Sequence, residues 1–298
     1  MRALGNYILR SPLHAIGVVS LMAVFSFYLS SILVAMLVMR KGGVFGLQVI
    51  AGSLVLSTLA MLLVLNIPLQ DLVVIALRAW LPVWCCAMAL RYSESQSVMI
   101  MLAGVFAAMF IIVLYSLVED VPGWWQNRFN ELMGALVEQN PTQEAMDAFE
   151  QLQAGMQSVA WMINPFIVTF LLISLVTTLL AGRWWQALLF NPGAFKKEFY
   201  TLRLPRPLLY LLLPGALYLL LLPGGDTGMV RDLLWLIIIL YMFQGISRVH
   251  QLVSRRNLSL AWLVTMYVLL VILIPYMIVL VACLGMADSW SGRRKISS

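Results

Sequence analysis

Eight long runs of apolar residues, separated by short polar segments, dominate the pattern of this chain. A transmembrane helix needs about 20 mainly apolar residues to cross the hydrocarbon core of a bilayer. The pattern therefore predicts an all-α fold, a polytopic membrane helical bundle that forms a single domain over residues 1–298. The runs are Leu13–Met39, Val44–Leu65, Leu72–Leu90, Val98–Val118, Phe166–Ala181, Leu208–Leu222, Leu233–Ser247 and Leu258–Met286.

The segment between the fourth and fifth runs, residues 119–160, departs from this pattern. It carries seven acids against one base, Arg128. Apolar residues recur at helical spacing in its two halves, from Trp125 to Leu136 and from Ala145 to Val159. We therefore predict a hairpin of two amphipathic helices on the extracytoplasmic side of the membrane.

The segment 183–206, between the fifth and sixth runs, is rich in basic residues. Lys and Arg are retained on the cytoplasmic side of a membrane, so this basic loop is predicted to be cytoplasmic. Alternation along the chain then places residues 119–160 outside, in agreement with their acidic character. Arg231, which follows Asp226 and precedes Asp232, is the isolated cation that this orientation leaves on the outer side.

The first and last runs leave the position of the two basic tails open. If each run crosses once, both tails lie outside. If each run breaks and returns, both lie in the cytoplasm, with breaks offered by the serines at 26, 30 and 31 and by Pro275. Each run is long enough to cross the membrane once as a tilted helix but too short to cross it twice. The basic tails favour the broken, cytoplasmic alternative.

Composition narrows the class of protein. Hydrophobic residues make up 62% of the chain and charged residues only 11%, well below the ~25% of soluble domains. The basic residues form short clusters between apolar runs, which suits anionic lipid headgroups and not nucleic acid. No catalytic motif and no metal-ligand spacing occurs, so we expect neither an enzyme, a metal site nor a cofactor. The expected location is the bacterial inner membrane, with several crossings.

Three polar residues within or beside apolar runs are candidates for ligand binding. Arg78 lies in the third run, seven residues after Asp71, which places both side chains on one helix face. Charges within spans are costly and are often functional, although Arg78 could instead extend toward the outer interface beside Asp71. Gln244, in the seventh run, could line a cavity or hydrogen-bond a neighbouring helix.

The basic loop is a second candidate site. Lys196, Lys197, Arg203 and Arg206 could hold anionic headgroups or an acidic partner protein, at about 1 kcal/mol per basic residue near the surface. Alternatively, these charges only fix the orientation of the chain.

Three short motifs resemble the DUF2232 (YybS-like) family of bacterial membrane proteins. Asn191-Pro192-Gly193, Phe195, Glu198-Phe199 and Leu202-Arg203-Leu204 are similar to its NPGxFxxEFxxLRL signature. Ala287-Asp288-Ser289-Trp290 with Arg293-Arg294 resembles its C-terminal pattern, and Leu37–Gly42 resembles its first loop.

The resemblance implies a function only loosely, because the family has no firmly assigned activity. It is grouped with the substrate-binding S components of energy-coupling-factor vitamin importers and with the shape protein MreD. The first hypothesis for the function is a transport-related subunit that works with a cytoplasmic energising partner. S components dock their partner through small residues, often AxxxA, on the first span, and Leu13–Met39 lacks that motif. The alternatives are a non-transporting envelope scaffold with protein partners, or a lipid-handling protein.

Overall fold

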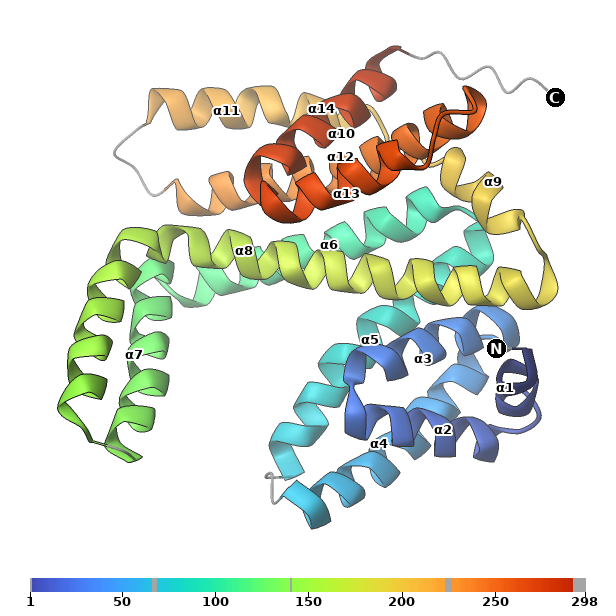
Figure 1. Ribbon diagram of the computed structural model, residues 1–298, viewed down its shortest axis with the longest axis horizontal. Helices are drawn as coiled ribbons and strands as arrows, with labels where there is room; N and C mark the ends of the chain where they lie inside the picture. Colours follow the sequence, from blue (N-terminus) through green and yellow to red (C-terminus); the bar gives the residue numbers. More distant parts are fainter. Residues whose placement is uncertain (1, 66–68, 140, 223–226, 292–298) are drawn as a thin grey trace.

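The computed structural model describes residues 2–65, 69–139, 141–222 and 227–291 (Figure 1). These residues form α-helices and no strand, which confirms the all-α prediction. Within the described residues, six helices are long and apolar enough to cross a membrane, so the chain is a polytopic helical bundle. They are α4 (Gly43–Leu65), α5 (Leu69–Ser93), α6 (Gln96–Leu117), α8 (Gln143–Phe190), α12 (Gly228–Arg255) and α14 (Ile274–Ser291).

The first apolar run is broken, as the second alternative required. After the short helix α1 (Arg2–Ile8), α2 (Pro12–Phe25) and α3 (Phe27–Lys41) meet at Ser26, whose backbone is extended. The two helices then run back alongside each other (Figure 1). Protein packs on one side of the break, where Trp80 of α5 donates a hydrogen bond from Nε1 to Ser30 Oγ at 3.0 Å, whereas Phe25 and Tyr28 beside Ser26 are exposed. Such a break is tolerated in a membrane only where protein or a water-filled cavity covers the freed backbone groups.

The last run is broken too. A turn at Leu273 separates α13 (Ala261–Ile272) from α14, next to Pro275, which has no N–H to continue the helix. Consequently α1 and the end of α14 both lie at the same end of the molecule as α9 (Ala194–Tyr200) (Figure 1). We call this the α9 end. It contains the basic segment that the sequence predicts to be cytoplasmic.

Small residues allow the central helices to approach closely. A Cβ added at Gly245 of α12 would lie 1.9 Å from the carbonyl oxygen of Val281 in α14. A Cβ at Gly182 of α8 would lie 2.8 Å from the Cβ of Ala35 in α3. Close backbone contact of this kind is how membrane helices gain packing energy without a hydrophobic driving force. The short helix α11 (Leu212–Leu221) lies outside this core, against α12, and α10 (Pro207–Tyr210) contacts α11.

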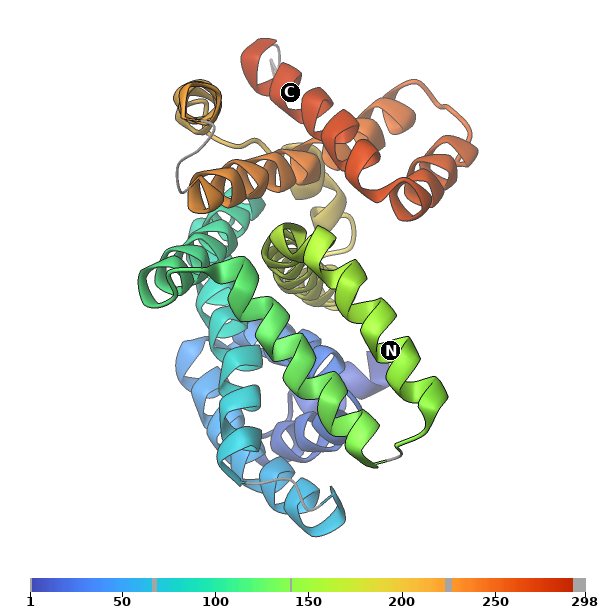
Figure 2. The same ribbon diagram turned by 90° about the vertical axis from the view of Figure 1, so that its left-hand side faces the viewer.

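The acidic hairpin consists of α7 (Val121–Gln139) and the first part of α8, at the end opposite α9. The second amphipathic helix and the fifth apolar run form one continuous helix of 48 residues that contains Pro165. The hairpin projects at a steep angle from the ends of α6 and α8 (Figures 1 and 2). α7 packs mainly against α8 and not against the ends of α3 to α5.

Candidate functional site

The three residues predicted to bind a ligand do not form one site. Arg78 and Asp71 are exposed on α5, and Gln244 of α12 is completely buried. Among the described residues, no hydrogen bond or ion pair joins Arg78 or Asp71 to Gln244. The structure therefore places Gln244 in the second of the roles considered for it, as a residue that bonds neighbouring segments.

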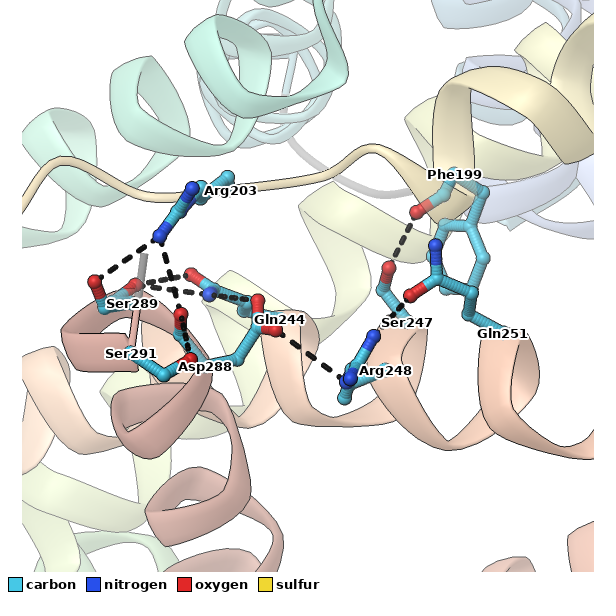
Figure 3. Close-up of polar contacts among 9 residues, drawn as sticks. All are labelled: Phe199, Arg203, Gln244, Ser247, Arg248, Gln251, Asp288, Ser289 and Ser291. Atoms are coloured by element: carbon cyan, nitrogen blue, oxygen red, sulfur yellow. Dashed lines mark hydrogen bonds and ion pairs between the residues drawn. The ribbon is translucent and has the colours of Figure 1, made fainter. Parts of the chain in front are cut away.

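Gln244 lies at the centre of a buried polar cluster at the α9 end (Figure 3). Its Oε1 accepts a hydrogen bond from the backbone N–H of Leu204 at 2.8 Å. Its Nε2 lies 3.0 Å from Asp288 Oδ2 and 2.9 Å from Ser289 Oγ, both in α14. Arg248, one turn further along α12, places its Nε 3.4 Å from Asp288 Oδ1. The cluster joins the segment after α9, the middle of α12 and the end of α14.

Two arginines of the segment after α9, the half-buried Arg203 and the exposed Arg206, bond backbone oxygens at the end of α14. Arg203 donates from Nη2 to the carbonyl oxygens of Asp288 and Ser289, each at 3.2 Å (Figure 3). Arg206 donates from Nε to the Ser289 carbonyl oxygen at 3.0 Å. The last carbonyls of a helix lack intrahelical partners and carry partial negative charge, so two guanidinium groups stabilise the end of α14. The four predicted lipid- or partner-binding residues thus divide into two pairs, because Arg203 and Arg206 bond the end of α14, whereas Lys196 and Lys197 are exposed on α9.

The only acid of the basic segment is also held within the protein. Glu198 forms a salt bridge with Arg183, which lies inside α8, and accepts a hydrogen bond from Gln96 Nε2 of α6 at 3.4 Å. The backbone N–H of Arg203 donates to Ser97 Oγ at 2.8 Å. These contacts fix α9 and the following segment against α6 and α8.

The Leu37–Gly42 motif, the third of those that resemble the family, lies at the same end of the molecule. Arg91, at the end of α5, donates from Nη1 to the carbonyl oxygen of Met39 at 2.7 Å and so caps α3. Gly42, which follows α3, has φ 101°, a backbone conformation that favours glycine. The three described motif segments therefore gather at the α9 end, whereas Arg293 and Arg294 lie outside the described residues.

A second polar cluster, at the hairpin end, was not predicted from the sequence. Asp232 of α12 is 1% exposed. Its Oδ2 accepts hydrogen bonds from Tyr115 Oη of α6 at 3.0 Å and from Asn164 Nδ2 of α8 at 2.6 Å. Arg231 Nε lies 3.4 Å from Asp232 Oδ1. Asn164 Oδ1 is buried and has no hydrogen-bond partner among the described residues.

This cluster stabilises α8 where Pro165 interrupts its hydrogen bonding. Proline has no N–H, so the carbonyl oxygen of Trp161, four residues earlier, loses its helical donor. Arg231 replaces that donor, with Nη2 3.1 Å from the Trp161 oxygen and its guanidinium carbon 5.2 Å from the centre of the Trp161 ring. We call Arg231, Asp232, Asn164 and Trp161 the kink clamp. Arg231, the isolated cation that the predicted orientation leaves on the outer side, was the signal in the sequence for this clamp.

The fold and these clusters define a multi-pass α-helical membrane protein whose polar side chains bond helices together at both ends. Residues 13–289 match the family model described as predicted membrane protein (DUF2232), which covers nearly the whole chain. The chain belongs to this family, as its motifs suggested. No curated protein and no solved structure matches it.

Proposed function

We propose that this protein is a membrane-embedded docking subunit of an envelope assembly, located in the bacterial inner membrane, and not an enzyme. Its acidic hairpin would bind a partner protein outside the membrane. The observation that carries the proposal is the exposure of apolar side chains on the hairpin: Leu132 is 69% exposed, Leu136 58% and Leu152 49%. Exposed apolar patches rimmed by polar residues are typical of interaction sites.

The charge of the hairpin indicates the chemistry of the partner protein that it would bind. The hairpin segment carries Glu119, Asp120, Glu131, Glu138, Glu144, Asp147 and Glu150 against Arg128 alone. An anionic membrane surface would repel this segment, whereas a basic protein surface would attract it. We therefore infer a partner with an apolar groove and basic residues around it. The clamp at Pro165 supports this role, because it holds the hairpin at a fixed angle to the spans.

Photo-crosslinking in cells tests the proposal. A photoreactive amino acid at Leu132 or at Leu152 is expected to form an adduct with the same protein species, whereas Glu144, which is exposed but polar, is the matched control. Replacing Glu131 and Glu138 by Gln should weaken that adduct, and the doubly substituted chain should fail to complement a deletion strain. Adducts to lipid alone, or equal labelling from Glu144, would refute docking by the apolar face.

A second candidate function is the transport-related one, in which the chain binds a small polar solute and an energising partner acts from the cytoplasm. The buried carboxylate of Asp232, next to the unpartnered Asn164 Oδ1, supports it, because ionisable residues within spans are often functional. A solute that raises the unfolding temperature of the purified protein, but not of the Asp232→Asn variant, would support it. Unchanged crosslinking of the hairpin in that variant would separate the two functions.

A further inference from the structure

An open hollow of about 360 Å³ lies at the α9 end, between α9, the end of α12 and the segment leading into α13. Its lining includes polar residues, namely Lys196 from α9 and His250, Ser254 and Asn257 from the end of α12 and the turn that follows. The lining also includes apolar residues, namely Val253 of α12 and Leu258, Leu260 and Leu263 at and just before the start of α13. The hollow therefore combines a cation with an apolar part.

The cation in this hollow is available for a ligand. Arg183, Arg203 and Arg206 of the same segment are engaged with Glu198 or with the end of α14. Lys196 is exposed, and its Nζ lies 5.5 Å from the centre of the Tyr200 ring. The hollow has no acidic residue in its lining, and the exposed Arg255 and Arg256 follow directly in the chain. An anion would meet attraction here and no opposing carboxylate.

The surroundings place the hollow at the level of lipid headgroups. α13, which begins beside it, exposes apolar side chains along its length, with Val264 61% and Val271 73% exposed. Trp262, in its first turn, is 64% exposed. Exposed aliphatic residues on a membrane helix contact acyl chains, and tryptophan is enriched at the interface between chains and headgroups. With α13 against acyl chains, the leucines of the lining, which lie in or just before α13, would be nearer to the acyl region than the polar residues of α12.

We propose that this hollow binds a phospholipid with a net negative charge. The ammonium group of Lys196 would pair with the phosphate, and Ser254 and Asn257 would donate to phosphate or glycerol oxygens. Leu260 and Leu263 would contact the first carbons of an acyl chain. The inference does not depend on the docking function of the hairpin, and the two can fail separately.

The test compares two neighbouring lysines of α9 in the full-length protein, purified in mild detergent. Native mass spectrometry would measure binding of phosphatidylglycerol, with phosphatidylcholine as the neutral-headgroup comparison. Lys196→Gln should weaken phosphatidylglycerol binding about five-fold, the equivalent of ~1 kcal/mol for a basic residue near an anionic headgroup. Lys197→Gln is the matched control, because Lys197 is also exposed on α9 but does not line the hollow, and it should leave binding within about two-fold.

Further measurements distinguish a lipid from a free anion and from diffuse surface charge. Leu263→Ser should weaken phosphatidylglycerol binding but leave the response to inorganic phosphate unchanged, since phosphate does not use the apolar part. Equal losses in the two lysine variants would show that only surface charge is sensed. Tight binding of inorganic phosphate alone, or equal affinity for phosphatidylcholine, would also overturn the proposal. Lys196 is exposed, so unfolding temperatures should confirm that its substitution leaves the fold intact.

Discussion

Replacing Arg231 by Ala should destabilise the protein more than replacing its partner Asp232 by Ala. Both residues belong to the kink clamp, but their exposure differs. The side chain of Arg231 is 32% exposed, whereas that of Asp232 is fully buried. Arg231→Ala leaves a carboxylate inside the bundle without its ion-pair partner and removes the donor to the Trp161 carbonyl. Asp232→Ala leaves behind a guanidinium that already reaches water.

The loss of unfolding free energy in each of the two variants is estimated from a different interaction. Removing one member of a buried ion pair costs about 3–5 kcal/mol, because an uncompensated buried charge remains. That figure applies to Arg231→Ala. Interhelical hydrogen bonds in membranes average about 0.6 kcal/mol, so losing the bonds from Tyr115 of α6 and Asn164 of α8 should cost Asp232→Ala about 1 kcal/mol. In the double variant the cost should fall below the sum of the two, because no buried charge is left.

Unfolding of the purified protein from mixed detergent micelles by dodecyl sulfate would measure these free energies. Amide hydrogen exchange would report on the kink, where residues just before Pro165 should exchange faster in Arg231→Ala than in the parent chain. Asp71→Ala is the matched control, since this carboxylate is exposed on α5 and should leave stability unchanged. A larger loss in Asp232→Ala than in Arg231→Ala, or additive losses in the double variant, would refute the reasoning.

Three other predictions concern packing, the buried network and topology. Gly245→Val should prevent the close packing of α12 on α14 and abolish the folded protein. Gly17→Val should be tolerated, because Gly17 has open space around it. Circular dichroism and size-exclusion chromatography would measure both effects. Gln244→Leu should lower the free energy of unfolding by about 2 kcal/mol or more, because a buried backbone N–H loses its acceptor, and the dodecyl sulfate titration would measure this. Cysteines at Gln139 and Ser291 should react with a membrane-impermeant reagent from opposite faces, and labelling from the same face would contradict the orientation.

The apolar runs were sufficient to predict the all-α membrane bundle, because hydrophobic length and composition alone identify spans. Whether the first run breaks at Ser26 could not be decided from its sequence. A broken helix exposes backbone groups, and only protein or a water-filled cavity around the break makes it acceptable. The protein beside this break includes Trp80, distant in the chain, which bonds Ser30. The same limit applies to Pro165, since its sequence neighbours do not show that α8 continues through the proline with Arg231 satisfying the freed carbonyl.

The roles of the charged side chains were harder to predict from the sequence than the spans. Counting cations identified the basic segment but could not show that Arg203 and Arg206 bond the end of α14, more than eighty residues later in the chain. The carbonyls that they satisfy are recognisable only once helix ends are placed in space. The burial of Asp232 could not be predicted, because this acid is adjacent in sequence to Arg231 and such a pair is usually solvated. Whether Lys196 and Lys197 bind lipid stays a prediction.

α12 links the two polar clusters and determines how they can act together. Asp232 and Gln244 are twelve residues apart on one helix, which is about 18 Å at 1.5 Å per residue. The residues from Leu236 to Phe243 between them are almost all buried, and Gly245 is already fixed against α14. Packing along this stretch opposes bending between the clusters, so α12 fixes the distance from the hairpin end to the α9 end. A fixed distance agrees with the docking function proposed for the hairpin, which needs the hairpin held rigidly on the spans.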